Sequence, residues 1–264
     1  MKNFRLEECL LVDILPQLFV NPLLNIVDSK DKIWIAMSML SRCHKYATDS
    51  LAVLEKESLV GVLGSREIIQ SMCFESRSNL FEKTTVEVMS KNFHIVSSKS
   101  KFHDILKQMK NNRDGLLLSK NEFGSISAIS QHNLIEIGML YESSVKVDQI
   151  PSTEIITFNK NDTIDQILLL MYENHTDTLF LENSPLFINS KIIFEKIIAD
   201  STHSCNIDDV MKIKATTFTL NEATLISENG TIADMCKLMF VMKYPVLMTR
   251  SKILMPYDLL HVFN

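Results

Sequence analysis

Polar side chains recur where a predicted helix follows a short apolar strand, and these are the residues whose types could do chemistry. The candidates are Glu67, Ser130, Asn133 and Asp258. A serine hydroxyl at such a place can cap the helix, and a carboxylate in the first turn interacts favourably with the helix dipole. Both roles are purely structural, so a role in binding a ligand needs a further argument.

The chain carries none of the sequence patterns that usually mark a catalytic centre. It has no nucleophile elbow, no phosphate-binding loop and no glycine-rich dinucleotide fingerprint. Cys43 beside His44, and His203 near Cys205, are not joined by a second pair at zinc-ligand spacing. We therefore predict that the protein is not an enzyme and holds no metal ion.

The elements that must position the candidate residues recur along the chain as a repeated unit. Each unit has a strand, a helix, a second strand, a tight turn, a third strand and another helix. Short lead-in segments at residues 86–89, 147–150 and 208–211 recur at a spacing of about 61 residues. This period predicts a mixed α/β (α+β) fold built from four β-α-β-β-α units.

The apolar strands lack clean alternation of polar and apolar residues, which indicates sheets that are buried on both faces. A three-stranded sheet with two helices buries too little surface to be stable alone, so the units should pair. We predict one module at residues 1–140, with units at 1–74 and 84–140, and a second at 145–264, with units at 145–200 and 205–264. Residues 219–228 read as an insertion in the last unit.

Composition limits the possible partners and location. The 264 residues are 46% hydrophobic and carry a formal net charge of −5, which suits a packed core and argues against broad binding to nucleic acid. The five scattered cysteines fit a reducing compartment. The apolar run at 10–24 is broken by Asp13, Pro16 and Pro22, so it fits neither a signal peptide nor a membrane span. We expect a soluble, cytoplasmic protein.

Short motifs at the third strands add a family resemblance. Gly61-Val62-Leu63 matches the opening of a family motif, Ser130 with Leu134 its middle and end, and Asp258-Leu259 its end. On these residues and on the repeat period, nearly the whole chain resembles four cystathionine-beta-synthase (CBS) domains arranged as two Bateman modules.

The resemblance implies that paired units leave clefts that bind adenosine compounds such as AMP, ADP, ATP or S-adenosylmethionine. In the family an Asp accepts hydrogen bonds from both ribose hydroxyls, and a Ser or Thr caps the helix and contacts phosphate. By position, Asp258 would contact ribose and Ser130 phosphate, while Asn133 and Glu67 occupy the Asp position of their units.

The chain departs from the motif in every unit. Unit one has Gly64 where the hydroxyl is expected, and unit four has Met255. Unit three has Asn189 and Ile192 at the hydroxyl and Asp positions, so its ribose site looks lost.

Two hypotheses follow from the resemblance. In the first, the protein is a regulatory sensor that binds an adenosine-type ligand and alters its interactions with a partner. In the second, it is a ligand-free CBS scaffold for dimerisation or protein docking. We also expect a protein partner or a homodimer, because the apolar residues Leu259, Leu260 and Phe263 on the last helix would need cover.

Overall fold

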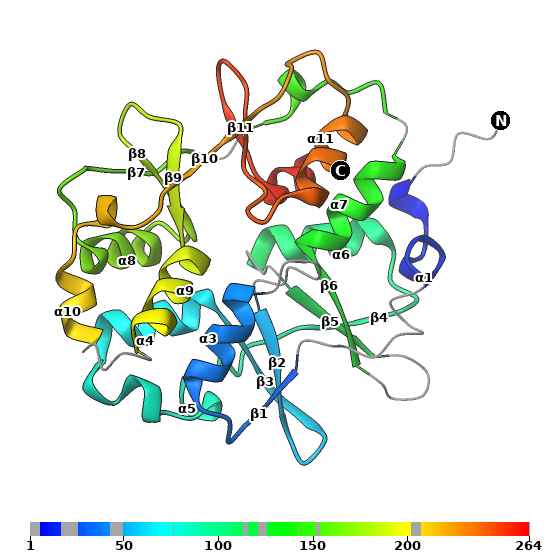
Figure 1. Ribbon diagram of the computed structural model, residues 1–264. Helices are drawn as coiled ribbons and strands as arrows, with labels where there is room; N and C mark the ends of the chain where they lie inside the picture. Colours follow the sequence, from blue (N-terminus) through cyan, green and yellow to red (C-terminus); the bar gives the residue numbers. More distant parts are fainter. Residues whose placement is uncertain are drawn as a thin grey trace.

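The structure is a computed structural model that describes residues 6–16, 26–42, 50–75, 77–112, 116–120, 126–141, 143–151, 154–201 and 207–263. It contains four small mixed sheets with helices packed against them (Figure 1). The predicted α/β fold of repeated units is therefore confirmed.

Units one and two follow the predicted order of elements. Unit one consists of β1 (Ile26–Asp28), α3 (Ile33–Arg42), β2 (Ser50–Glu55), β3 (Ser58–Gly64) and α4 (Ser65–Phe74). Unit two consists of β4 (Ile95–Ser97), α6 (Phe102–Asn112), β5 (Leu116–Lys120), β6 (Ile126–Ser130) and α7 (Gln131–Leu140). Their lead-in elements are η1 (Leu6–Glu8) and α1 (Leu11–Ile14) for unit one, and η2 (Arg77–Glu82) and α5 (Thr85–Val88) for unit two.

Units three and four repeat this order with shorter strands. Unit three consists of β7 (Thr157–Phe158), α8 (Ile164–Glu173), β8 (Thr178–Leu181), β9 (Leu186–Asn189) and α9 (Ser190–Ser201). Unit four consists of β11 (Thr224–Leu225), α11 (Ile232–Val241), β12 (Leu247–Met248), β13 (Ile253–Leu254) and the 3₁₀ helix η5 (Pro256–His261). Their lead-in elements are η3 (Val147–Gln149), then α10 (Ile207–Lys212), η4 (Ala215–Thr217) and β10 (Asn221–Glu222).

All four sheets share one topology. The first strand of a unit pairs in parallel with the second, and the second pairs antiparallel with the third. A parallel connection needs a crossover, which the first helix of each unit provides. Successive residues Leu51, Ala52 and Val53 of β2 are all 0% exposed, so this sheet is covered on both faces, as the lack of alternation predicted.

Units one and two exchange their lead-in segments. Thr85 N, at the start of α5, donates a hydrogen bond of 2.8 Å to Asp31 O in the loop before α3 of unit one. Leu11 N, at the start of α1, donates one of 3.0 Å to Ser100 O in the loop before α6 of unit two. The lead-in helix of each unit therefore lies on the other unit.

Units three and four make the same exchange. Val147 N of η3 donates 3.0 Å to Gly230 O of unit four, and Ala215 N of η4 donates 2.8 Å to Asp162 O of unit three. The exchange ties together the unit pairs that the sequence grouped into modules, while the residue boundaries given above stay a prediction.

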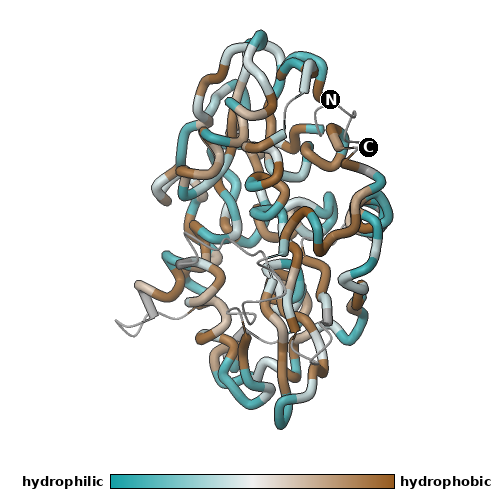
Figure 2. The backbone as a smooth tube through the Cα atoms, turned by 90° about the vertical axis from the view of Figure 1, so that its right-hand side faces the viewer, coloured by the Kyte–Doolittle hydropathy of each residue, from teal (hydrophilic) through white to brown (hydrophobic). Residues whose placement is uncertain are grey.

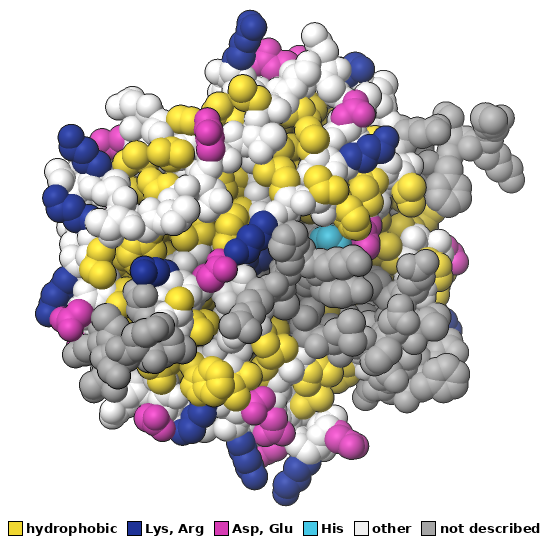
Figure 3. Space-filling view, in the orientation of Figure 1, with side chains coloured by type: hydrophobic (Ala, Val, Ile, Leu, Met, Phe, Trp, Pro, Cys, Tyr) yellow, Lys and Arg dark blue, Asp and Glu magenta, His cyan; other side chains and the backbone are white. Residues whose placement is uncertain are grey.

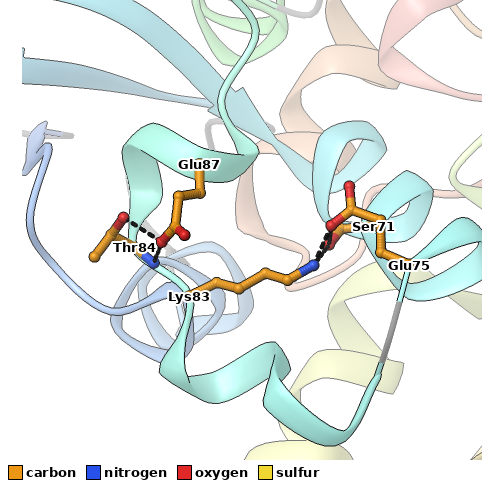
Figure 4. Close-up of polar contacts among 5 residues, drawn as sticks. All are labelled: Ser71, Glu75, Lys83, Thr84 and Glu87. Carbon is orange, nitrogen blue, oxygen red and sulfur yellow. Dashed lines mark hydrogen bonds and ion pairs between the residues drawn. The ribbon is translucent and has the colours of Figure 1, made fainter.

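A polar cluster holds the segment between units one and two against α4 (Figure 4). Lys83 Nζ donates to Ser71 Oγ at 3.0 Å and also pairs with the carboxylate of Glu75. One residue further on, Glu87 Oε2 accepts from Thr84 N and Thr84 Oγ1, both at 2.6 Å. These hydrogen bonds favour the charged carboxylate and lower the pKa of Glu87.

The segment predicted to be an insertion in unit four joins another sheet. Residues 221 and 222 form β10, which pairs antiparallel with β9 of unit three. In the first pair, Ser90 makes the equivalent contact with Val62 at the edge of β3, with hydrogen bonds of 2.8 and 3.0 Å. The chain thus crosses the sheet edge of one unit before it enters the next.

The helices form the contact between the two pairs. In Figure 1 the sheets of units one and two lie in the lower part and those of units three and four in the upper part. Helix α3 packs on α9, α4 on α8, and α7 on α11. In Figure 2 the hydrophobic stretches run through the interior of both halves, which matches one large core shared by units one and three and another shared by units two and four.

One prediction about the surface was wrong. Leu259 and Leu260 are 0% exposed and Phe263 is 2% exposed, because η5 packs on α6 and α7. The Phe263 ring lies 5.9 Å from that of Phe102 and 5.3 Å from that of Tyr141. These residues are covered within the chain, so they provide no argument for a homodimer.

No helix in the described ranges is both long and apolar enough to cross a bilayer. Cys236 is buried against Gly138, and burial raises the pKa of its thiol to about 12. Cys9 and Cys73 are half-buried.

Candidate functional site

The four junctions between a third strand and its helix meet at one cavity of about 890 Å³. Residues from all four units line it, so it is a product of the whole chain. Small-molecule sites typically have volumes of about 300–1,000 Å³, and this cavity falls in that range.

The second residue of each junction helix faces the cavity. These residues are Arg66 in α4, His132 in α7, Lys191 in α9 and Tyr257 in η5. Three of the four are basic. Lys191 is only 8% exposed, so a cationic side chain is held in a largely buried wall of the site.

One position later is the family's Asp position. In units one and two its side chain accepts a hydrogen bond from a backbone N–H at the start of the same helix. Glu67 Oε2 accepts from Gly64 N at 2.8 Å. Asn133 Oδ1 accepts from Ser130 N at 2.9 Å and from Ser130 Oγ at 3.1 Å, while Asn133 Nδ2 donates to Glu136 at 3.1 Å. The amide of Asn133 is therefore engaged on both sides, and Ser130 Oγ acts as a donor to Asn133.

Unit four uses its carboxylate in the same way, but inside the protein. Asp258 Oδ2 accepts from Met255 N at 2.7 Å, and Asp258 is 0% exposed. In unit three the bond runs the other way, since Ile192 N donates to Asn189 Oδ1 at 3.0 Å. All four junctions are thus closed by a side chain–backbone hydrogen bond between residues three apart.

The structure separates the four predicted site residues. Glu67 lines the cavity, whereas Ser130, Asn133 and Asp258 do not. Instead, the neighbours of the last three reach it: His132 beside Ser130 and Asn133, and Tyr257 beside Asp258.

Two histidines in the cavity wall each lie near a lysine. The Lys110 ammonium is 3.2 Å from His261 Nδ1, so this nitrogen acts as the acceptor. Burial and the charge of Lys110 lower the pKa of His261. Burial, with a smaller effect from Lys191, likewise lowers the pKa of His132, although Glu136 opposes the shift. Both imidazoles are therefore mainly neutral at pH 7.

A further wall of the cavity joins units three and four. Lys243 Nζ lies 2.7 Å from Glu195 Oε2, and the Tyr244 hydroxyl donates to the same oxygen at 3.0 Å. The Lys243 ammonium also sits 5.1 Å from the centre of the Tyr244 ring. This contact holds a cation and an aromatic ring at the cavity wall.

Apolar side chains line the space between these polar groups. The main contributors are Ile69, Ile135, Met171, Tyr172 and Met239. The ring of Phe240 stacks on His132, with centroids 5.1 Å apart and an interplanar angle of 28°. An apolar lining with a few convergent charges suits a ligand that has both a flat ring and an anionic group.

Sequence reasoning missed Arg66, His132 and Lys191. Each stands one residue before the position that the family motif assigns to Asp. Aligning the four junctions by unit would have placed these three basic residues in one column, which is the signal that could have found them.

The described part of the chain contains no cluster of three or more His, Cys, Asp or Glu placed to hold a metal ion. Cys43, His44, His203 and Cys205 lie outside the described residues. On the face seen in Figure 3, acidic and basic side chains are interspersed, and no broad basic surface appears there.

Comparisons with known proteins agree on the fold. No protein-family model and no curated protein matches the chain. Among solved structures, protein MJ1225 from Methanocaldococcus jannaschii, a proposed archaeal homologue of γ-AMPK, matches 95% of this chain and 99% of its own, with a TM-score of 0.78 and 14% identity.

An uncharacterized conserved protein from Pyrococcus horikoshii matches 82% of this chain and 91% of its own, with a TM-score of 0.51 and 13% identity. The CBS-domain containing protein ATU1752 from Agrobacterium tumefaciens matches 52% of this chain and 96% of its own, with a TM-score of 0.43 and 13% identity. The chain has the fold of CBS domains in Bateman modules, so the predicted resemblance is confirmed at the level of the fold.

Proposed function

We propose that the protein is a regulatory module that binds an adenine nucleotide in the central cavity and changes its interaction with a protein partner in response. The observation that carries the proposal is the convergence of Arg66, His132 and Lys191 from three units on one cavity. Anionic groups are favoured where helix starts and basic side chains meet.

The similarity to MJ1225 supports the choice of ligand class, because that protein is described as a proposed homologue of γ-AMPK and shares the four-unit arrangement. Of the residues predicted from the sequence, we assign a direct ligand contact to Glu67, which lines the cavity. We assign Ser130, Asn133 and Asp258 an indirect role, since their hydrogen bonds fix the helix starts that carry His132 and Tyr257.

A ligand in this cavity would contact all four units at once. It would therefore bias how the two pairs lie against each other, because the pairs meet through the same helices that begin at the cavity. The surface offered to a partner, or to a second copy in a homodimer, would change with occupancy.

Thermal unfolding with AMP, ADP, ATP, S-adenosylmethionine and NAD tests the proposal. A ligand at a hundred times its dissociation constant adds about 2.7 kcal/mol to the free energy of unfolding. For a chain of this size we expect the midpoint to rise by about 5–10 °C. The variant Lys191→Met should reduce this rise. Its matched control is Lys107→Gln, which removes an exposed lysine of α6 away from the cavity and should leave the rise unchanged.

A flat panel would contradict nucleotide binding and favour the ligand-free scaffold. The scaffold hypothesis is supported by the hydrogen bonds of Asn133 and Asp258. Both side chains accept from a backbone N–H at the start of their own helix, so they are already engaged within the protein. Under the scaffold hypothesis, Lys191→Met would leave every midpoint shift unchanged at zero.

A further inference from the structure

We propose that the Asn229–Gly230 pair is a site of spontaneous deamidation, and that conversion of Asn229 to isoaspartate releases the lead-in element η3 from unit four. The two residues lie in the loop before α11 and do not line the central cavity. The proposal is therefore independent of nucleotide binding, and it concerns how the second pair of units is held together.

Deamidation needs only the chain and water. The backbone nitrogen of the residue after an asparagine attacks the side-chain amide carbon and forms a cyclic succinimide. Ammonia leaves, formed from the amide –NH2 group and the proton of the attacking nitrogen. Water then opens the ring at either of its two carbonyl groups, which gives aspartate or isoaspartate. In isoaspartate the main chain runs through the former side chain and is longer by one carbon.

Asn229 is the one asparagine of the 264-residue sequence that is followed by glycine. Asparagine is a chemically labile residue, and a following glycine speeds the attack because it has no Cβ to crowd the nitrogen. Asn229 is exposed, so water reaches the reacting amide.

The structure shows why glycine follows Asn229. A Cβ built on Gly230 would lie 3.0 Å from Ser227 O and 3.6 Å from Val147 Cγ2. Glycine therefore suits the close approach of η3 to this loop. The packing of the lead-in element thus favours a labile pair of residues at the contact itself.

The hydrogen bonds of η3 lie on both sides of Asn229. Val147 N donates to Gly230 O at 3.0 Å, and Asp148 N donates to Glu228 O at 3.1 Å. An extra main-chain carbon at residue 229 changes the spacing of these two acceptors. The two successive donors of η3 then cannot both reach an acceptor, so isoaspartate breaks the contact that joins η3 to unit four.

The equivalent loops of units one and two make the same pair of contacts around a residue that cannot deamidate. In unit one Lys30 lies between two carbonyls that accept from α5, and in unit two Lys99 lies between two that accept from α1. A lysine has no side-chain amide, so these loops are inert.

Unit three provides a matched control within the chain, because Asn161 is its counterpart of Asn229. Ala215 N donates to Asp162 O at 2.8 Å, and Thr216 Oγ1 donates to Lys160 O at 3.1 Å. Here, however, the next residue is Asp162, whose side chain crowds the attacking nitrogen.

The two nitrogens that would attack are held alike. Gly230 N donates to Ser227 O and Asp162 N donates to Asn159 O, both at 2.9 Å. Each turn must therefore open locally before its nitrogen can react. A difference in rate between the two sites then reports the residue that follows the asparagine.

Incubation of the full chain in mildly alkaline buffer at body temperature, followed by proteolysis and mass spectrometry, tests the chemistry. The peptide that contains Asn229 should gain the mass difference between –NH2 and –OH at least about tenfold faster than the peptide that contains Asn161. An isoaspartate-specific methyltransferase should label the converted peptide. Equal rates at the two asparagines would overturn the assignment of the site.

Hydrogen exchange and thermal unfolding of the converted protein test the release of η3. Val147 N and Asp148 N should lose about tenfold or more of their protection, and the thermal midpoint should fall by about 2–6 °C. Protection of Thr85 N, which makes the equivalent contact in unit one, should stay the same. Full protection of Val147 N and Asp148 N after conversion would overturn the release of η3.

Two variants separate the chemistry from its consequence. Asn229→Gln keeps the amide on a longer side chain that closes the ring poorly, so incubation should change neither its mass nor its midpoint. Asn229→Asp carries the charge of the product on a main chain of normal length, so Val147 N and Asp148 N should stay protected. Loss of their protection in Asn229→Asp would overturn the inference, because charge and not the longer main chain would then break the contact.

Discussion

The helix starts after β6 and after β13 use the same local hydrogen bond and present different surfaces to the cavity. In both, a side chain accepts from the backbone N–H three residues earlier: Asn133 from Ser130 N at 2.9 Å, and Asp258 from Met255 N at 2.7 Å. The start of α7 then offers His132 to the cavity, whereas the start of η5 offers Tyr257.

The difference shows that the acid of the family motif and the chemistry of the cavity are separate properties. Asp258 matches the motif best, yet it is fully buried and does not line the cavity. His132 belongs to a unit that lacks the acid, yet it faces the space where a ligand would lie. In units two and four the residue before the motif position faces the cavity and the motif position does not, whereas in unit one both Arg66 and Glu67 line it.

The largest expected effect is on stability: removing the buried carboxylate of Asp258 should cost more unfolding free energy than removing the half-exposed carboxylate of Glu67. Asp258→Ala leaves Met255 N without its acceptor inside the core and should cost about 1–3 kcal/mol of unfolding free energy. Glu67→Ala should cost about 0.5–1 kcal/mol, as for loss of a capping contact near solvent. Urea denaturation measures both values.

Asp258→Asn is the matched control, because its amide oxygen can still accept from Met255 N. It should recover much of the stability that Asp258→Ala loses. If Asp258→Ala cost no more than Glu67→Ala, the proposed structural role of Asp258 would be wrong.

A smaller effect, on ligand affinity, is expected when unit four receives a basic residue at the second helix position, as the other three units have. Of the four junction helices, the one that begins after β13 lacks a basic residue at its second position. Tyr257→Lys places a cation there and should tighten ATP binding by about threefold to tenfold. Titration calorimetry measures the change. Tyr257→Phe removes the hydrogen bond of 3.3 Å to Lys110 O without adding charge and should not tighten binding. Equal affinity in the two variants would contradict the charge argument.

The smallest effect is a pH dependence of stability, to which His132 near the start of α7 and His261 at the end of η5 should both contribute. Burial lowers the pKa of His132 in the folded protein, and Lys191 adds to the shift while Glu136 on the same helix opposes it. The unfolded chain therefore binds more protons at low pH. The stability contribution is fully present above the unfolded pKa of about 6.5 and is lost as pH falls from that value through the lower pKa of the folded state.

Urea midpoints between pH 5 and pH 8 check this dependence. His132→Gln should show a flatter profile than the original chain across the window. His261 contributes in the same direction, because burial and Lys110 lower its pKa, so His132→Gln with His261→Gln should be flatter still. An unchanged slope in the double variant would show that folding lowers the pKa of neither imidazole.

Local structure was largely predictable from the sequence. The sequence predicts a helix at 131–140 and a strand at 178–181, and these coincide with α7 and β8. Apolar periodicity also predicts that Phe102, Ile105 and Met109 form the buried stripe of a helix, and in α6 all three are 0% exposed. Where the periodic stretch is short the boundaries differ: the sequence predicts a last helix from Tyr257 to Phe263, and the structure has the 3₁₀ helix Pro256–His261.

The cavity was not predictable in the same way. Its walls come from units that lie far apart in the sequence, and their meeting depends on how helices of different units pack. The burial of Asp258 and Leu259 likewise depends on η5 packing against α6 and α7. Local pattern indicates which face of a helix is apolar, but it does not say which neighbour covers that face.

The exchange of lead-in segments bears on how the chain matures during synthesis. Unit one has all of its strands once residue 64 has left the ribosome, but the helix that rests on its β1–α3 loop, α5, ends only at Val88. Unit three similarly waits for Ala215, which bonds to Asp162. The smallest portion of nascent chain that can close its own surface is therefore a pair of units, and a gene fragment that encodes a single unit should yield an aggregation-prone product.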